Sequence, residues 1–181
     1  GGSPAGSGNV ISGNGGDGIL ISGSTATANL IAGNRIGVSA AGTALGNQGF
    51  GIRVTDGADD TRIGLSTNAS SGNLIGANGQ DGIRVDGTGT DRVRVHNNHI
   101  GMSSTGTVLA NHDDGIEING SGSGHQIGGI AANQRNVIAA NSGVGIALRG
   151  TGANATTVIN NVIGFDAANN QIGRASCRER V

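Results

Sequence analysis

Short aliphatic segments alternate with segments rich in glycine and asparagine along this chain, and the alternation repeats. The stretch 8–36, GNVISGNGGDGILISGSTATANLIAGNRI, recurs at 72–100 and again at 135–163. Gly18, Gly82 and Gly145 align across the three copies, with offsets of 64 and 63 residues. Self-similarity at a fixed period indicates a repeat architecture in which each unit packs against its neighbours.

Three series of aliphatic residues run through the repeats and predict three short strands per unit. The first series, each member preceded two positions earlier by asparagine, is Ile11, Ile36, Ile75, Ile100, Ile138 and Ile163. The second is Ile19, Ile52, Ile83, Ile116 and Ile146, and the third is Ile31, Ile63, Val95, Ile127 and Val158. In GIRVTD the residues alternate, with Ile52 and Val54 facing one way and Arg53 the other, which is typical of a half-buried strand.

These strands are too short for helices and are bracketed by Gly, Asn, Ser and Asp, which favour turns. Three strands per turn, stacked on their equivalents in the next turn, predict an all-β parallel solenoid of about five complete coils. Its core is expected to be a rod on the order of 25 Å long. All sixteen residues of the three series are expected to be buried.

The segments NVISGN, DGILISG and NRIGVSAAGTALGN resemble bacterial right-handed parallel β-helix repeat proteins of the pectin-lyase-like superfamily. They are most similar to large exported repeat proteins in which NVIxGN and IGTxxxGTxxLGN alternate. The resemblance covers residues 1 to about 171 and implies a right-handed parallel β-helix in an extracellular or bacterial cell-surface protein. It does not fix the function, because this fold hosts lyases, hydrolases, epimerases, phage tailspikes and passive stalks.

The expected domain organisation follows the repeats. Residues 1–171 form one β-helix domain of double-coil repeats at 1–63, 64–127 and 128–171, which we expect to be an uncapped piece of a longer array. The last ten residues, IGRASCRERV at 172–181, resemble the one-frame translation of a sequencing adapter, and we interpret them as a non-native tail; a short basic tail is the competing interpretation. Cys177, the chain's one cysteine, then carries no redox or catalytic role.

Composition narrows the classes of partner. The net charge is −1 and the chain has no lysine, so no basic footprint for nucleic acid is present. No apolar run reaches the length of a membrane-spanning helix, and we expect no membrane insertion. With two Phe and neither Trp nor Tyr, the core is expected to be thin and aliphatic.

Two further repeated features favour structural roles. The asparagines that precede the first aliphatic series are predicted to form a buried column that satisfies backbone groups at a turn; its members are Asn9, Asn34, Asn73, Asn98, Asn136 and Asn161. The long turns at 37–49 and 101–113 are copies of one another, and Leu45 and Leu109 are predicted to hold each turn against the barrel.

Candidate chemistry lies at the second strand. Its outward column is predicted to run through Leu20, Arg53, Arg84, Glu117 and Ala147, and the column before it through Asp17, Phe50, Asp81, Asp114 and Val144. A patch of Asp81, Arg84, Asp113, Asp114 and Glu117 on two neighbouring coils is therefore expected. Clustered carboxylates with arginine suit a polyuronate lyase or hydrolase, in which Ca²⁺ is the one cofactor we would expect.

A structural interpretation of the same patch competes with the catalytic one. Asp17, Asp81 and Asp114 occupy one repeat position, so Asp-Gly there indicates a turn. Glu117 beside Arg84 is expected to form an exposed ion pair across two coils, which contributes little stability. Lacking aromatic platforms and a lysine base, the patch is interpreted as non-catalytic.

The four histidines do not form a metal-binding pattern. We expect them to lie on the surface, because their repeat equivalents are unrelated residues; they are His96, His99, His112 and His125. No metal site and no cofactor are predicted outside the enzyme hypothesis.

The sequence therefore predicts a structural or adhesive rod of an exported bacterial surface protein. Its partners would be cell-surface or extracellular polysaccharide and neighbouring coils of the same longer chain. The alternative is the scaffold of a carbohydrate-active enzyme of the polyuronate lyase, hydrolase or epimerase type. A phage-type receptor-binding rod is a third possibility, which trimerisation on a sizing column would reveal.

Overall fold

The structure is a computed structural model that describes residues 8–65 and 71–164. The predicted tail at 172–181 lies outside the described residues, as do residues 1–7. The short strands are β1 (Val10–Ile11), β3 (Leu30–Ile31), β4 (Arg35–Ile36), β6 (Arg62–Ile63), β7 (Leu74–Ile75), β9 (Arg94–Val95), β10 (His99–Ile100), β12 (Gln126–Gly128), β13 (Val137–Ile138), β15 (Thr157–Ile159) and β16 (Val162–Ile163). The four-residue strands are β2 (Ile19–Ser22), β5 (Ile52–Thr55), β8 (Ile83–Asp86), β11 (Ile116–Asn119) and β14 (Ile146–Arg149). The 3-10 helices that lie wholly within the described residues are η2 (Ala132–Gln134) and η3 (Thr151–Ala153).

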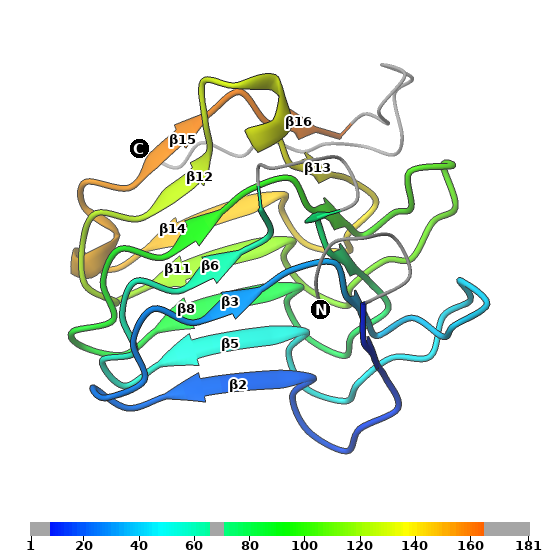
Figure 1. Ribbon diagram of the computed structural model, residues 1–181, viewed down its shortest axis with the longest axis horizontal. Coiled ribbons are helices and arrows are strands. Elements are labelled where there is room, and N and C mark those ends of the chain that lie inside the picture. The colour runs from blue at the N-terminus through cyan, green and yellow to red at the C-terminus, as the bar shows by residue number, and fades with distance from the viewer. Residues whose placement is uncertain (1–7, 66–70, 165–181) are drawn as a thin grey trace.

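The strands form three parallel sheets that wrap around one core (Figure 1). One sheet has six strands, in the order β1-β4-β7-β10-β13-β16, and the other two have five each, β14-β11-β8-β5-β2 and β15-β12-β9-β6-β3. Each turn of the chain contributes one strand to every sheet, so each five-stranded sheet spans about four turns and roughly 19 Å. The all-β, right-handed parallel β-helix with three strands per coil is the observed fold.

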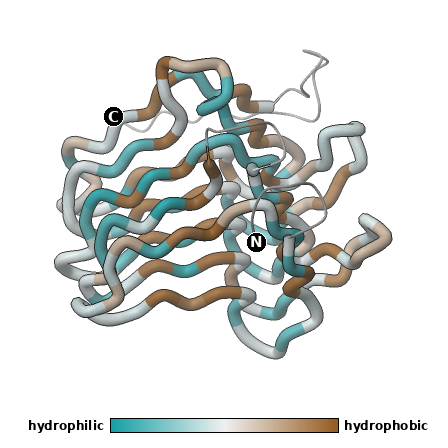
Figure 2. Tube along the Cα trace, in the orientation of Figure 1, coloured by the Kyte–Doolittle hydropathy of each residue, from teal (hydrophilic) through white to brown (hydrophobic). Residues whose placement is uncertain are grey.

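The register of every sheet follows the predicted aliphatic series. Ile52 pairs with Ile19 on one side and with Ile83 on the other, and Ile63 pairs with Ile31 and Val95 in the same way. Figure 2 shows the resulting hydrophobic segments at the same place in successive coils. Because parallel strands place equivalent residues side by side, the series become continuous ladders of apolar side chains inside the solenoid.

Burial along these ladders depends on the position in the stack. Eleven of the sixteen ladder residues are buried, but Ile11, Ile19 and Ile146 are only partly buried, and Val158 and Ile163 are 43% and 37% exposed. The expectation that all sixteen are buried is therefore wrong at the ends. A residue in a terminal coil of the described stack has a neighbouring coil on one side only, so part of its side chain stays accessible.

The predicted asparagine column is confirmed, but its burial holds only for the four central members, since Asn9 is exposed and Asn161 half-buried. Asn34, Asn73, Asn98 and Asn136 are at most 3% exposed. Each of these four side chains accepts hydrogen bonds from the preceding asparagine and donates to a backbone carbonyl or to the next asparagine. Asn73, for example, donates from Nδ2 to the carbonyl of Ile31 at 2.9 Å and to Oδ1 of Asn98 at 2.8 Å. The column thus satisfies backbone groups at the corner between two sheets.

A second asparagine column, absent from the predictions, lies at another corner. It consists of Asn14, Asn47, Asn78, Asn111 and Asn141. Adjacent members are joined by amide-to-amide hydrogen bonds of 2.7–2.8 Å. Each member precedes a residue of the second aliphatic series by five positions, so the repeat spacing could have revealed it.

The two copied turns form matching hairpins that project from the solenoid (Figure 1). Each is closed by an isolated antiparallel bridge, Val38 with Ala44 and Met102 with Val108. The prediction for their leucines holds for one copy: Leu109 is buried, whereas Leu45 is 51% exposed. Leu109 contacts the turn at Gly76, where a Cβ would come within 2.6 Å of its side chain.

The described part of the chain contains no helix long and apolar enough to cross a membrane.

Candidate functional site

The outer face of the sheet β14-β11-β8-β5-β2 carries the predicted charged column. The strand register places Leu20, Arg53, Arg84, Glu117 and Ala147 side by side in that order. The predicted column is therefore confirmed, and it brings Arg84 and Glu117 together on neighbouring coils. The site sits where these strands begin, because the acidic residues of the preceding turns lie immediately before them.

Three aspartates at the starts of these strands fasten one coil to the next. Oδ1 of Asp17 accepts a hydrogen bond from the backbone N–H of Phe50 at 2.9 Å, and Oδ1 of Asp81 accepts one from Asp114 at 3.0 Å. Oδ1 of Asp114 accepts the equivalent bond from Val144 at 2.7 Å. The interpretation of this repeat position as a turn signature is supported, with the added finding that the bond crosses between coils.

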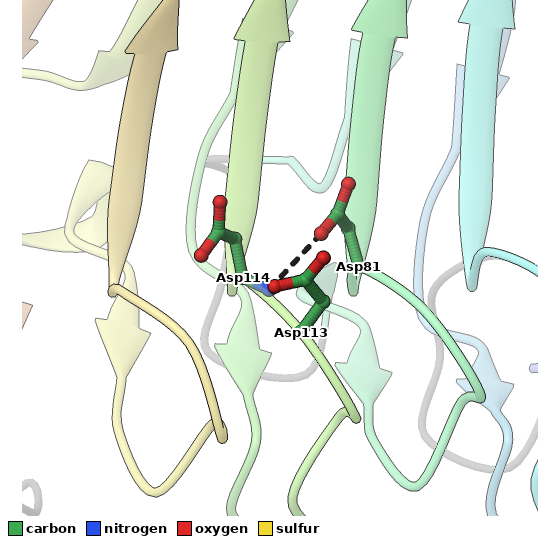
Figure 3. Close-up of side chains that lie close together, drawn as sticks. All are labelled: Asp81, Asp113 and Asp114. Carbon is green, nitrogen blue, oxygen red and sulfur yellow. Dashed lines mark hydrogen bonds between the residues drawn. The ribbon is translucent and has the colours of Figure 1, made fainter.

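Asp81, Asp113 and Asp114 form an acidic cluster (Figure 3). One carboxylate oxygen from each lies within 4.8 Å of the others. Asp81 and Asp114 are 1% and 2% exposed, whereas Asp113 is exposed to solvent. The predicted meeting of these residues on two neighbouring coils is confirmed, and Asp113 is the member that a ligand could reach.

Burial sets the proton affinity of this cluster. The pKa of Asp81 is raised to about 6, mainly by desolvation. The backbone hydrogen bond from Asp114 lowers it, and the nearby carboxylates of Glu117, Asp113 and Asp114 add to the rise. Asp81 therefore takes up a proton in mildly acidic solution, where an exposed aspartate stays ionised.

Two arginines cover the cluster on its outer side. Arg84 pairs with Glu117 and lies 3.5 Å from Asp81, measured from Nη1 to Oδ2. Arg149 pairs through Nη1 with Asp114 at 2.8 Å and with Glu117 at 2.6 Å. The prediction of an exposed Arg84–Glu117 pair is wrong in one respect: the side chain of Glu117 is 5% exposed. Long arginine side chains from both adjacent coils fold over it and exclude water.

The network extends beyond the predicted residues. Asp86 pairs with Arg53 at 3.0 Å and with Arg84 at 3.1 Å, and the two guanidinium groups lie 5.6 and 5.7 Å from the centre of the Phe50 ring. The sequence did not single out Asp86 or Arg149. Both belong to a second outward column, two residues after the first, in which Asp86, Asn119 and Arg149 are in register.

The donor set of the acidic cluster does not fit a calcium ion. Ca²⁺ takes about six to eight oxygen ligands that are free to coordinate. Asp81 uses Oδ1 on a backbone N–H and directs Oδ2 toward Arg84, and Asp114 uses Oδ1 on the N–H of Val144 and Oδ2 on Arg149. Two cations already neutralise these carboxylates, so a divalent ion would have to displace both arginines.

The prediction that the histidines lie on the surface is wrong for His125, which is 1% exposed. Its Nδ1 accepts a hydrogen bond from the backbone N–H of Val93 at 3.3 Å, so the neutral ring carries its proton on Nε2 and donates to Oγ of Ser121 at 2.9 Å. That tautomer cannot act as a base toward Ser121. His112 is exposed, and His96 and His99 are half-buried.

A groove of about 480 Å³ lies on another face, between the two projecting hairpins. Leu74 lies at its floor, flanked in register by Arg35 and His99, and Ser103 and Thr107 of the second hairpin line one wall. It does not include any residue of the acidic cluster. The predicted chemistry and this hollow are therefore separate features of the solenoid.

No family model, no curated protein and no solved structure matches this chain.

Proposed function

We propose that this chain forms a structural and adhesive rod of an exported bacterial surface protein, which contacts cell-surface or extracellular polysaccharide through its repeated outer faces. The observation that supports this proposal is the continuous register of three aliphatic ladders and two asparagine columns. In such a stack the repeated buried polar side chains serve to join one coil to the next, and the outer faces present regular columns at the strand spacing.

The acidic cluster supports a structural role over a catalytic one. Oxygens of Asp81 and Asp114 are engaged by backbone N–H groups of the following coil, and Glu117 is enclosed by Arg84 and Arg149. Removing any of these side chains would leave buried hydrogen-bonding groups without partners. The cluster thus contributes to coil stacking, and weak contacts repeated along the rod would give it avidity for a polymer.

Binding to a polymer should depend on how many copies of the chain are presented together. We expect beads carrying the purified chain at high density to retain extracellular polysaccharide, and beads at low density to retain far less per molecule, because linked weak contacts multiply. Beads coated with an unrelated protein of equal charge are the control. Absence of retention at every density would contradict the adhesive role, and a shift of the polysaccharide to shorter chains would contradict the non-catalytic one.

A carbohydrate-active enzyme is the second candidate, favoured by one observation. Asp81, whose pKa is raised to about 6, lies against the exposed side chain of Asp113, so a carboxyl that can exchange a proton in mildly acidic solution lies beside one that solvent reaches. The test is depolymerisation of uronate polymers, with and without Ca²⁺, by the parent chain and by the double variant Asp113→Asn/Asp114→Asn. Cleavage by the parent that the double variant loses would establish the enzyme; no cleavage by either protein supports the rod.

A further inference from the structure

Two arginines lie side by side on the outer face of the sheet β15-β12-β9-β6-β3. Arg62 of β6 and Arg94 of β9 are register partners in adjacent parallel strands, about 4.8 Å apart along the solenoid axis. Like charges placed directly opposite one another in a sheet are destabilising. A sequence that keeps both arginines here therefore carries a cost that nearby groups must offset.

The carboxylates around these arginines do not neutralise them fully. Asp60 lies 3.6 Å from Nη1 of Arg94 and also pairs with Nε of Arg92 at 3.2 Å, while Asp59 pairs with Arg92. Within residues 8–65 and 71–164, Arg62 has no carboxylate within ion-pair distance. Asp59 and Asp60 thus form ion pairs with Arg92 and Arg94, and Arg62 is left with only the longer-range attraction of Asp60, so positive charge remains there.

Both arginines open on a pocket of about 340 Å³. Its lining is Arg62, Gly64, Leu65, Arg94, His96 and Gln134. Oε1 of Gln134 accepts the backbone N–H of Ala131 at 3.2 Å, which leaves the amide NH₂ of Gln134 to donate. None of the described lining residues carries a carboxylate, and burial together with Arg94 lowers the pKa of the half-buried His96, so its imidazole is neutral at neutral pH. The two guanidinium groups and the amide of Gln134 therefore offer hydrogen-bond donors from two neighbouring coils and from η2.

We propose that this pocket binds a tetrahedral oxyanion, a sulfate or phosphate group carried as an ester on a polysaccharide. Guanidinium forks bind such oxygens with paired charge-assisted hydrogen bonds. Donors on two coils and on η2 approach from different directions, as the oxygens of a tetrahedral anion require. The negative charge of the anion would also relieve the repulsion between Arg62 and Arg94. The inference rests on the proposed surface role only in assigning the anion to a polymer.

Titration with inorganic sulfate tests the pocket independently of any polymer. We expect saturable binding to the parent chain at low ionic strength, with the amide resonances of β6 and β9 shifting in NMR spectra. Arg62→Gln and Arg94→Gln should each weaken binding roughly tenfold or more, because each removes a charged donor. The matched control is Arg53→Gln, which removes the same charge from an arginine already paired with Asp86 and should leave sulfate affinity unchanged.

Comparison of dextran sulfate with neutral dextran of equal length distinguishes a polymer-borne group from a free ion. Retention of dextran sulfate alone, lost in Arg62→Gln but kept in Arg53→Gln, supports the assignment. Sulfate binding without retention of dextran sulfate overturns the assignment to a polymer while the ion site stands. Equal losses in Arg62→Gln and Arg53→Gln, or no sulfate binding by a folded parent chain, overturn the site itself, whatever the outcome of the bead experiment for the surface role.

Discussion

Asn34 donates two hydrogen bonds to the same oxygen atom of Asn73 in the next coil, one from its backbone N–H at 3.0 Å and one from its side-chain amide at 3.0 Å. Asn73 in turn donates to Ile31 and Asn98. Each asparagine is thus an acceptor toward one coil and a donor toward another. An aspartate has the same shape but cannot donate, so it can fill only half of this role.

Replacing a central asparagine of this column should therefore be costly. We expect Asn73→Asp to lower the free energy of unfolding by about 3 kcal/mol or more, because it places an unpaired charge against the acceptors of Ile31 and Asn98. Urea unfolding measures the change. The control is Asn9→Asp at the edge of the column, where the residue is exposed and the loss should stay below about 1 kcal/mol. Equal losses at the two positions would contradict the donor-and-acceptor account.

A charged substitution at the centre of an aliphatic ladder should be at least as destabilising as one in the asparagine column. Ile83 is 0% exposed and lies in register between Ile52 and Ile116, so Ile83→Asp buries a carboxylate with no partner. We expect a loss on the order of 4 kcal/mol or more, or failure to fold, measured by circular dichroism during thermal unfolding. Ile130→Asp, at a position that is 88% exposed, is the matched control and should melt like the parent. A parent-like Ile83→Asp would show that the inward ladder is misassigned.

The fold was predictable because the repeat supplies its own alignment. Once Ile52 is aligned with Ile83, the pairing of Arg53 with Arg84 follows, since side chains alternate with a period of two. Burial at the ends was not predictable from the pattern: Val158 has the same repeat position as Ile127, yet it is exposed because, among the described residues, its ladder has a neighbour on one side only. Sequence periodicity reports which face a residue takes, not whether another coil covers it.

The acidic cluster was predictable in its membership, whereas the added partners Asp86 and Arg149 and the burial of the site were not. Asp81, Asp114 and Glu117 were expected together because adjacent columns of one sheet must meet. The burial of Glu117 depends on the paths of the Arg84 and Arg149 side chains, which several rotatable bonds separate from the backbone pattern. The raised pKa of Asp81 follows from that burial, so it could not be read from the column alone.

Asp81 should make stability depend on pH in a defined direction. Its pKa in the folded state is about 6, above the usual 3.8, so the folded state holds the proton more tightly and stability is lost as the pH rises from about 4 to 6. Asp81→Asn keeps an acceptor for the N–H of Asp114 and removes the titration. We expect the stability of the variant minus that of the parent to be greater at pH 7 than at pH 4 by on the order of 2 kcal/mol. Urea unfolding of both proteins at both pH values measures this difference.

The control for Asp81 is Asp17→Asn. Asp17 makes the same bond to the next coil but lies outside the acidic cluster, so its variant separates the loss of a carboxylate at this turn position from the loss of one within the cluster. If Asp81→Asn and Asp17→Asn behave alike between pH 4 and 7, the carboxylates of the cluster do not act on one another as the geometry indicates.

His125 should act in the opposite direction. Burial lowers the pKa of His125 in the folded state, and Asp91 partly offsets this effect. The contribution of the neutral ring to stability is therefore present above about pH 6.5, the pKa expected for the unfolded chain. It is lost as the pH falls through the folded pKa. Protonation of Nδ1 would also break the bond from Val93. We expect the parent to lose more stability than His125→Gln when the pH falls from 7.5 to 5, measured by urea unfolding. His112→Gln, at an exposed loop position, is the control. A loss of the parent's pH dependence in His112→Gln but not in His125→Gln would refute the assignment to the buried ring.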